Sequence, residues 1–242
     1  MAAERMKHPD MSGAHDMRLV FWELTASCNL KCKHCRAEAQ EEAIEGELTT
    51  QDIIRVAREI RESADPIMIL TGGEPLARKD FFEIAEACTG LFSRVALATN
   101  GTLIDDALAQ RIVKTGIQRV SISIDGANPA THDSFRGLPG SFAAAMNGID
   151  CLQRADASVQ MNMTVTQHNE HELAPLLDFA LEKGIDAFHV FMLVPVGCGA
   201  EISDDVRLTP AAFERSLHWL ATRTLELQGR IQIKATCAPQ YY

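Results

Sequence analysis

Residues 19–35 read LVFWELTASCNLKCKHC, an apolar run that leads directly into three closely spaced cysteines. Cys28, Cys32 and Cys35 form a C-x3-C-x2-C spacing after a run with the character of a β-strand. Three thiolates on one short loop can hold three irons of a [4Fe–4S] cubane and leave the fourth iron open to another ligand. A structural zinc site normally needs four protein ligands, and no second Cys or His pair follows at zinc-finger spacing. The loop therefore predicts an iron–sulfur site, with a zinc-stabilised α/β binding protein as the non-enzyme alternative.

Beyond this loop, short apolar runs alternate with longer amphipathic segments. The alternation of strand-like and helical patterns predicts six β–α units and hence a parallel sheet with right-handed crossovers. The pattern fits an open doubly wound sheet, a full eight-stranded barrel or an arrangement between them, and it does not choose among the three. The predicted strands, which are apolar almost throughout, are Leu19–Leu24, Ile67–Leu70, Val95–Thr99, Val120–Ile124, Val159–Val165 and Phe188–Leu193.

Start and stop residues mark the helices between these strands. Thr50, Asp80 and Ser141 are each predicted to cap or precede a helix with apolar residues at helical spacing. Gly184 lies just beyond a predicted helix, where a left-handed cap is expected. A further strand-like run, Ile231–Lys234, comes near the end of the sequence.

Composition and charge narrow the class of protein. A chain of 242 residues, 46% of them hydrophobic, can form one globular domain with a large core. The net charge of −10 disfavours binding to a nucleic-acid backbone. No apolar run approaches the roughly 20 residues that cross a bilayer, and no signal peptide is recognisable at the start. An odd number of cysteines, seven, argues against a disulfide framework. We therefore expect a cytoplasmic protein that binds neither nucleic acid nor membrane.

A second motif, TGGEP at 71–75, follows the second predicted strand. Ligand sites of barrels and open α/β sheets form at the carboxyl ends of the strands. Paired glycines let a backbone approach a ligand closely, and a neighbouring carboxylate can receive a charged amine. An ordinary turn is the simpler reading of the same residues.

Together, the two motifs resemble the radical S-adenosylmethionine (SAM) superfamily. The hallmark of that family is C-x3-C-x-φ-C, with an aromatic-type residue, here His34, before the last cysteine. The resemblance implies a partial (β/α)6 barrel and a [4Fe–4S] cluster whose open iron binds SAM and reductively cleaves it to a 5′-deoxyadenosyl radical. Gly72, Gly73 and Glu74 look like the family's motif for the methionine amino group. Asn100, after the third strand, fits the same ligand-facing edge.

A third match consists of SISIDG at 121–126 and HDSFRG at 132–137. It resembles the SAM-contacting strand of the subgroup with an additional C-terminal cluster domain, known as SPASM. The resemblance implies that Ser123 and Arg136 approach the ribose and the carboxylate of SAM. A buried strand end for Ser123 and a surface ion pair for Arg136 are the alternatives. Asn162 and Thr164, on the fifth strand, are further candidates for SAM contact.

Four local strings resemble the radical SAM proteins of alternative heme biosynthesis. That group includes the iron-coproporphyrin decarboxylase (heme synthase), the didecarboxysiroheme deacetylase and the heme-d maturation protein, and the resemblance to the first is greatest. It implies oxidative decarboxylation of iron-coproporphyrin propionates. A radical SAM maturase of a ribosomally synthesised peptide is the alternative within the superfamily. The four strings are FWELT at 21–25, CRAEA at 35–39, FMLVPVG at 191–197 and TCAPQYY at 236–242.

The expected organisation has three parts: a polar N-terminal extension over 1–17, a radical SAM partial barrel over 18–208, and a C-terminal region over 209–242. The last part is interpreted as a helix and the incomplete beginning of a SPASM-like auxiliary cluster region. Cys237 is then a candidate ligand of a second iron–sulfur cluster. The expected partners are a small-molecule tetrapyrrole and a reductant such as ferredoxin or flavodoxin.

Four other residues have open roles. Cys198 stands where the resemblance would place an arginine, and a cluster ligand, a redox thiol and a small residue between glycines are all compatible with it. His189, on the sixth strand, is either a tetrapyrrole contact or a satisfied core histidine. Cys88 and Cys151 fall on apolar helix faces and are expected in the core.

Overall fold

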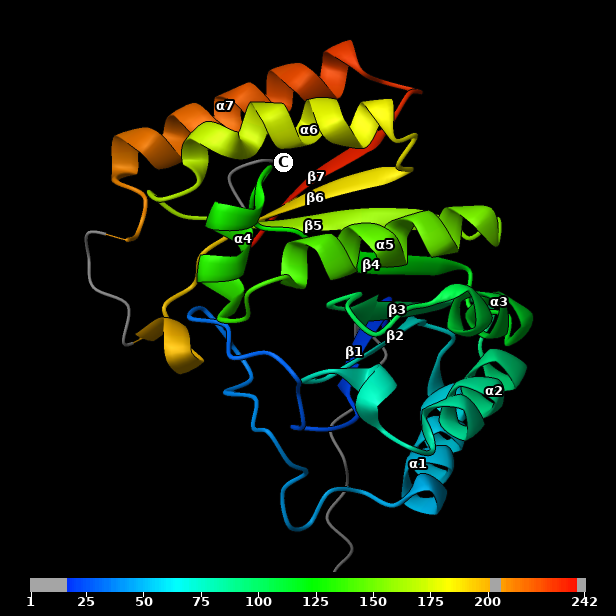
Figure 1. Ribbon diagram of the computed structural model, residues 1–242. Helices are drawn as coiled ribbons and strands as arrows, with labels where there is room; N and C mark the ends of the chain where they lie inside the picture. The colour runs from blue at the N-terminus through cyan, green and yellow to red at the C-terminus, as the bar shows by residue number, and fades with distance from the viewer. Residues whose placement is uncertain (1–16, 201–205, 239–242) are drawn as a thin grey trace, which may run out of the picture.

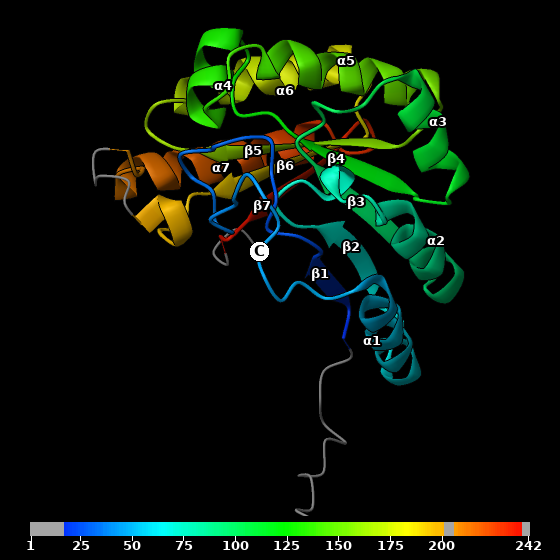
Figure 2. The same ribbon diagram turned by 60° about the horizontal axis from the view of Figure 1, so that its bottom comes forward.

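The computed structural model describes residues 17–200 and 206–238. Seven parallel strands form one sheet in the order β1-β2-β3-β4-β5-β6-β7, so each strand pairs with its neighbours in sequence. Figure 2 shows the strands following a curve, with the helices on its outer side. The strands are β1 (Leu19–Glu23), β2 (Ile67–Thr71), β3 (Val95–Thr99), β4 (Arg119–Ser123), β5 (Val159–Val165), β6 (Ala187–Met192) and β7 (Gln232–Thr236).

Helices connect the strands and cover the outer face of the sheet (Figure 1). None of the described helices is both long enough and apolar enough to span a bilayer. The α-helices are α1 (Thr50–Ser63), α2 (Phe81–Leu91), α3 (Asp106–Lys114), α4 (Pro129–Arg136), α5 (Ser141–Arg154), α6 (Leu173–Glu182) and α7 (Pro210–Glu226), and the short 3-10 helices are η1 (Pro75–Ala77), η2 (Glu170–Glu172) and η3 (Gly197–Ala200).

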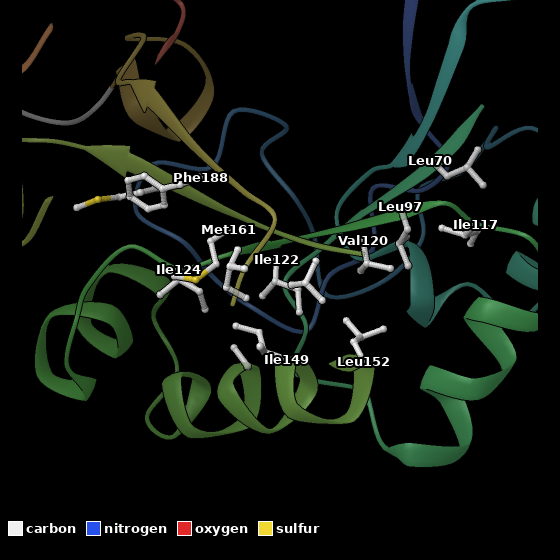
Figure 3. Packing of buried hydrophobic residues seen from close by; sticks show 14 of the residues in the cluster. Leu70, Leu97, Ile117, Val120, Ile122, Ile124, Ile149, Leu152, Met161 and Phe188 are labelled. Atoms are coloured by element: carbon white, nitrogen blue, oxygen red, sulfur yellow. The ribbon is translucent and has the colours of Figure 1, made fainter. Parts of the chain in front are cut away.

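The core lies between the sheet and these helices. Successive side chains of a strand point to opposite faces, so every second residue faces the helices. On β4, Val120 and Ile122 are fully or almost fully buried, and Ile149 and Leu152 of α5 belong to the same apolar cluster. Figure 3 shows these side chains gathered between the sheet and α5. The helices therefore bury one face of the sheet and leave the other as the inner face of the curve.

We call this inner side the concave face. Its residues are the strand positions that alternate with the core positions, and near the β1 edge some of them are exposed: Leu19 by 42% and Phe21 by 59%. The concave face consists of Leu19, Phe21 and Glu23 of β1, Ile67, Ile69 and Thr71 of β2, Ala96 and Ala98 of β3, Arg119, Ser121 and Ser123 of β4, Gln160, Asn162 and Thr164 of β5, Ala187, His189 and Phe191 of β6, and Gln232, Lys234 and Thr236 of β7.

The predicted α/β fold with a partial barrel is confirmed, and the six predicted strands agree with the structure to within one residue at each end. The sheet also has a seventh strand, β7, which includes most of the strand-like run Ile231–Lys234 and pairs with β6. The boundary expected at residue 208 thus falls between elements of one continuous sheet. An auxiliary cluster region beyond β7 stays a prediction.

The helix starts differ from the expectation in detail. The cap of α1 is Thr49 and not Thr50, because the Thr49 hydroxyl accepts from the N–H of Asp52. Asp80 does precede α2, but its carboxylate binds the Arg78 guanidinium and so makes no cap hydrogen bond. Gly184 has φ of 68°, the left-handed conformation predicted for it.

Candidate active site

The segment between β1 and α1, residues 24–49, carries the three predicted cluster ligands, and we call it the cluster loop. Cys28 is buried, whereas Cys32 and Cys35 are half-buried. Two backbone N–H groups of the loop point at sulfur: Leu30 donates to Cys28 Sγ at 3.4 Å, and Ala39 donates to Cys35 Sγ at 3.3 Å. Hydrogen bonds to the sulfurs stabilise and tune thiolates that bind iron. The cluster loop therefore supplies both the sulfurs and donors for them.

Burial favours the protonated form of two of these thiols, Cys28 and Cys32. Burial raises the pKa of the Cys28 thiol to about 11 and also raises the pKa of Cys32. Arg136 opposes the effect of burial on the pKa of Cys32, because its positive Nη1 donates to the sulfur over 3.7 Å. Iron must therefore displace protons from these thiols when it binds. The charge of Arg136 offsets part of the negative charge that the thiolates bring into the site.

The arrangement of the thiols fits a cluster better than a single ion. Within residues 17–200 and 206–238, no three His, Cys, Asp or Glu side chains converge closely enough to hold one metal ion. A [4Fe–4S] cluster is wider, because each thiolate binds a different iron. Three cysteines on one loop, with hydrogen bonds to their sulfurs, therefore fit the cluster, and the zinc alternative lacks a four-ligand set in the described chain.

Gly72 and Gly73 pack against the start of the cluster loop. A Cβ atom on Gly73 would lie 2.3 Å from the carbonyl oxygen of Ser27, and one on Gly72 would lie 2.5 Å from that of Thr25. The N–H of Gly73 donates to the Thr25 carbonyl at 2.7 Å. The close backbone approach that was predicted for Gly72 and Gly73 is therefore seen towards the backbone of the cluster loop. Their contact with SAM stays a prediction.

Two further glycines hold the rest of the loop. Gly137, at the end of α4, has φ of 73°, and a Cβ atom there would lie 2.4 Å from the Lys31 carbonyl oxygen. Gly197, at the start of η3, has φ of 58°, and its Cβ would lie 2.4 Å from the Arg36 carbonyl oxygen. Segments from three distant parts of the sequence therefore clamp the loop through glycine contacts, and side chains at these positions would displace it.

Glu74 is fully buried beneath the loop. One carboxylate oxygen accepts from the N–H of Leu76 at 3.0 Å, and the other accepts from the N–H of Asn100 at 2.8 Å. The Thr99 hydroxyl lies 2.8 and 2.9 Å from the two oxygens. Burial raises the pKa of Glu74, although these donors oppose the rise. Glu74 therefore ties the second and third strand ends together, in addition to the predicted binding of the SAM amine.

Asn100 joins this structure to the cysteines. Its Nδ2 donates to Asn29 Oδ1 at 2.8 Å and lies 3.9 Å from Cys28 Sγ, while its Oδ1 accepts from the N–H of Thr102 at 2.9 Å. Asn100 is almost completely buried. It fixes the cluster loop beside the end of β3, on the edge where we expected it.

Arg136 is buried beside the cluster loop and not at the surface. Its Nη2 lies 2.6 Å from Asp125 Oδ2, and this ion pair is inaccessible to solvent on the Asp125 side. Burial alone would raise the pKa of the Asp125 carboxyl, but Arg136 and the N–H of Thr164 hold it below its usual range. Nε of Arg136 has no hydrogen-bond partner among the described residues. The alternative of a surface ion pair is therefore wrong, and a buried donor remains beside Cys32.

His34 completes this buried group. Its ring stacks on Phe135 with centroids 4.2 Å apart, and its Nε2 lies 3.5 Å from Asp125 Oδ2. Burial lowers the pKa of His34 to about 4, and burial also lowers that of His132 to about 4, so both rings are neutral at pH 7. Nδ1 of His132 accepts from the backbone N–H of Asp125 at 3.2 Å. His34 thus attaches the cluster loop to α4 by stacking its neutral imidazole ring on the ring of Phe135.

The strand candidates lie on the concave face. Ser123, at the end of β4, pairs in register with Asn162, whose Oδ1 accepts from Gln160 Nε2 at 2.7 Å. Thr164 also belongs to this face, one step nearer the strand ends. Ser123 is half-buried and faces the interior of the curve, a position compatible with the predicted SAM contact.

The other four cysteines lie in three different places. Cys88 and Cys151 are buried in the apolar core, which confirms the expectation for both. Cys198 lies beside the cluster loop: its N–H donates to the Cys35 carbonyl at 2.9 Å, and it lines a cavity together with Cys32 and Cys35. Cys237 follows β7, is exposed and has φ of 60°. Its role as an auxiliary ligand stays a prediction.

Three residues of the site were not assigned from the sequence. Asp125, Gly137 and Gly197 each lie in a motif that was quoted above, but no role was given to them. Asp125 follows β4 directly, and a carboxylate at the end of a parallel strand is the signal that points to a site. The two glycines carry no such signal, because their importance depends on carbonyl groups more than 100 residues away in sequence.

Comparison with known families gives a match over most of the chain. The sequence model described as "Radical SAM superfamily" matches residues 22–180. A protein named "AdoMet-dependent heme synthase" from Methanosarcina barkeri is 48% identical over 93% of this chain and 63% of its own length. One named "Pre-heme d1 synthase" from Dinoroseobacter shibae is 37% identical over 88% of this chain and 52% of its own length. The chain thus spans between half and two thirds of the length of these curated relatives.

Solved structures agree on the fold. The crystal structure of Streptococcus suis SuiB bound to its precursor peptide SuiA aligns with a TM-score of 0.77, covering 91% of this chain and 49% of SuiB at 18% identity. The crystal structure of methylornithine synthase aligns with a TM-score of 0.64 over 93% of this chain at 14% identity. At such identities the likeness concerns the fold alone.

Proposed function

Because this chain belongs to the radical SAM superfamily, we propose that its protein is an enzyme that cleaves SAM reductively and uses the radical to modify a tetrapyrrole in heme biosynthesis. The observation that carries the proposal is the cluster loop, in which three cysteines meet a buried arginine and backbone donors. When bound, the [4Fe–4S] cluster and SAM supply a 5′-deoxyadenosyl radical, which abstracts hydrogen atoms.

The residues of the chain have distinct tasks in this proposal. Cys28, Cys32 and Cys35 hold three irons of the cluster. Arg136, whose buried Nε has no hydrogen-bond partner among the described residues, provides a charged donor for the SAM carboxylate. Its ion pair with Asp125 fixes the guanidinium, so that the donor does not need to be ordered when SAM binds.

Gly72, Gly73, Glu74, Asn100, Ser123 and His34 form the remaining SAM contacts in the proposal. Support comes from their placement: all lie at the carboxyl ends of β1 to β4 or on the loop above them, where a ligand of a parallel barrel binds.

The substrate that we propose is iron-coproporphyrin III. Each reacting propionate loses a hydrogen atom, carbon dioxide and one electron, and a vinyl group remains. Three relatives that are 41–48% identical are named as AdoMet-dependent heme synthases, whereas the mycofactocin maturases are 30–32% identical. The heme reading is therefore better supported than maturation of a peptide.

Further parts of the proposal concern the electron path and the compartment. Reduction of the cluster would require a donor such as ferredoxin or flavodoxin, and Cys237 would be one ligand of an auxiliary cluster that would accept the electron released from the substrate. We place the enzyme in the cytoplasm, without nucleic-acid or membrane partners, and assign 1–17 as an extension, 18–208 as the radical SAM part and 209–242 as the start of the auxiliary region.

Anaerobic turnover tests this function. The protein is reconstituted with iron and sulfide, reduced, and incubated with SAM and iron-coproporphyrin III. We expect formation of 5′-deoxyadenosine together with products that have lost one carbon dioxide and two hydrogens per propionate, read by mass spectrometry. Formation of 5′-deoxyadenosine with an unchanged tetrapyrrole would leave the radical chemistry intact and refute the substrate. No iron–sulfur absorption after reconstitution would refute the whole function.

A further inference from the structure

The concave face has two chemically different halves. On β1 and β2 it presents Leu19, Phe21, Ile67 and Ile69, of which Leu19 and Phe21 are substantially exposed. Glu23 and Thr71 lie on the same face at the carboxyl ends of these two strands. On β4 to β7 the same face carries two cations, Arg119 and Lys234, together with three amides and one histidine: Asn162, Gln160, Gln232 and His189. A ligand inside the curve therefore meets an apolar wall on one side and a positive wall on the other.

The cations have no acidic partner in the described part of the chain. Arg119 donates to neutral groups only, through Nε to Ser158 Oγ at 3.3 Å and through Nη1 to Gln232 Oε1 at 2.9 Å. The nearby carboxylate of Asp186 binds the Ser158 hydroxyl and the N–H of Val159 instead. No ion pair of Lys234 with any residue of 17–200 or 206–238 is present. In a chain of net charge −10, an uncompensated positive wall is unusual and favours an anionic ligand.

His189 adds a donor without an acceptor. The amide nitrogen of Gln160, Nε2, lies 3.0 Å from His189 Nδ1. Gln160 Nε2 also donates to Asn162 Oδ1. An amide nitrogen cannot accept, so Nδ1 is the acceptor and the proton of the neutral ring sits on Nε2. That Nε2 is buried and has no hydrogen-bond partner in the described residues. A buried donor left unpaired destabilises the folded protein, and an oxygen of an incoming ligand would remove this penalty as the neighbouring side chains shift.

The position of this wall relates it to the predicted SAM site. Ser123, Asn162, His189 and Lys234 are register partners across β4, β5, β6 and β7, so they form one row of the concave face. Three strand spacings separate Ser123 from Lys234, about 14 Å along the sheet. Lys234 thus lies on the concave face in the same row as Ser123, whereas Arg119 lies four residues before Ser123, at the start of β4, and reaches Gln232 of β7.

We propose that Arg119, His189 and Lys234 form the subsite for a carboxylate of the substrate, while the apolar half of the concave face takes its flat ring system. The proposal rests on the tetrapyrrole function given above and specifies which residues position the substrate. A propionate bound at this wall fixes the rotation of the macrocycle about its own plane. That rotation decides which of the other propionates faces the radical.

A comparison of the acid with its ester tests the subsite. Iron-coproporphyrin III and its tetramethyl ester share the ring, but only the acid is anionic. Binding of each to the reconstituted full-length protein is followed by the change in Soret absorption, in one detergent-containing buffer. The variants are Lys234→Gln and Arg119→Gln, and the matched control is Arg58→Gln, an exposed arginine on α1 at the outer face.

We expect each concave-face variant to raise the Kd of the acid by about 10- to 100-fold, because a hydrogen bond to a charged group is lost. The Kd of the ester should change little in both variants, which also shows that they are folded, and Arg58→Gln should leave both values unchanged. Equal loss of acid and ester, or an unchanged Kd of the acid in both variants, would overturn the subsite but leave the tetrapyrrole function standing. A wild-type protein that binds neither compound, but still cleaves SAM, would overturn the substrate and the subsite together.

Discussion

Replacing Gly73 with alanine tests how the cluster loop is held. The new Cβ would lie 2.3 Å from the Ser27 carbonyl oxygen, whereas ordinary contacts begin near 3.4 Å, so the two backbones must separate by roughly 1 Å. Two hydrogen bonds join these backbones: Gly73 N–H to the Thr25 carbonyl and Glu74 N–H to the Ser27 carbonyl, both at 2.7 Å. Separation of that size takes both bonds out of hydrogen-bonding range.

The expected cost follows from these contacts. Each lost hydrogen bond costs about 0.5–1.5 kcal/mol, and overpacking adds about 1–3 kcal/mol, which together give about 2–6 kcal/mol of unfolding free energy. Urea unfolding measures this loss. Iron and sulfide per chain after anaerobic reconstitution measure the second effect, because the displaced segment leads directly into Cys28.

Gly90→Ala is the matched control. Gly90 lies in α2, has an ordinary φ, and nothing lies within 4 Å of a Cβ placed there. Alanine at this helix position should stabilise the protein by about 0.5–1 kcal/mol and leave the iron content unchanged. If Gly73→Ala behaves like Gly90→Ala in both measurements, the account of the loop contacts is refuted.

Three other predictions concern the same region. Cys32→Ala should abolish formation of 5′-deoxyadenosine and most iron binding, because two thiolates do not retain the cubane. The control Cys88→Ala, in the core, should retain iron. Iron retention by Cys32→Ala would contradict the ligand assignment. Arg136→Gln should lower the unfolding free energy measured in urea by about 3–5 kcal/mol, because it leaves Asp125 buried without its cation. Arg154→Gln, at an exposed ion pair, should change the unfolding free energy little. Equal effects of the two substitutions would contradict the burial argument. Burial lowers the folded-state pKa values of His132 and His189 to about 4. Between pH 6.5 and pH 4 these histidines therefore bind more protons in the unfolded chain than in the folded chain. The stability that the two neutral histidines contribute is complete above pH 6.5 and falls as the pH drops towards 4, by up to about 1.4 kcal/mol per pH unit for each histidine. Urea unfolding between pH 7 and pH 4.5 should show a steeper loss of unfolding free energy for the wild type than for His132→Asn.

The first six strands were predictable because the residues that face the helices are apolar and mostly buried, which leaves a recurring apolar pattern. Val159–Val165 and Val95–Thr99 agree with the structure at both ends. β7 was harder to assign, because only two of its five residues are apolar: Ile233 and Ala235 are buried, whereas Gln232 and Lys234 are exposed. Whether the strands curl into a partial barrel was not readable from this pattern, since a doubly wound sheet has the same alternation.

The candidate site was predictable where one local motif holds several functional residues. Cys28, Cys32 and Cys35 stand within eight residues, so their spacing alone indicated a cluster. The partners that hold them were not readable, because Arg136 and Gly197 reach the loop from distant elements. The positive wall of Arg119 and Lys234 was also missed, since it exists only when β4 and β7 curve towards each other.

The glycine contacts have a consequence for how the protein matures in the cell. The cysteines are synthesised before Gly137 and Gly197, which contact the same loop and follow about 100 and 160 residues later. At about 5–20 residues per second, a ribosome needs on the order of ten to thirty seconds to pass from Cys35 to Gly197. During this interval the nascent thiols lie on an unclamped segment, open to oxidation and to stray metals. On this account, iron and sulfide would be retained only after Gly197 has been synthesised and the glycine contacts with the loop have formed.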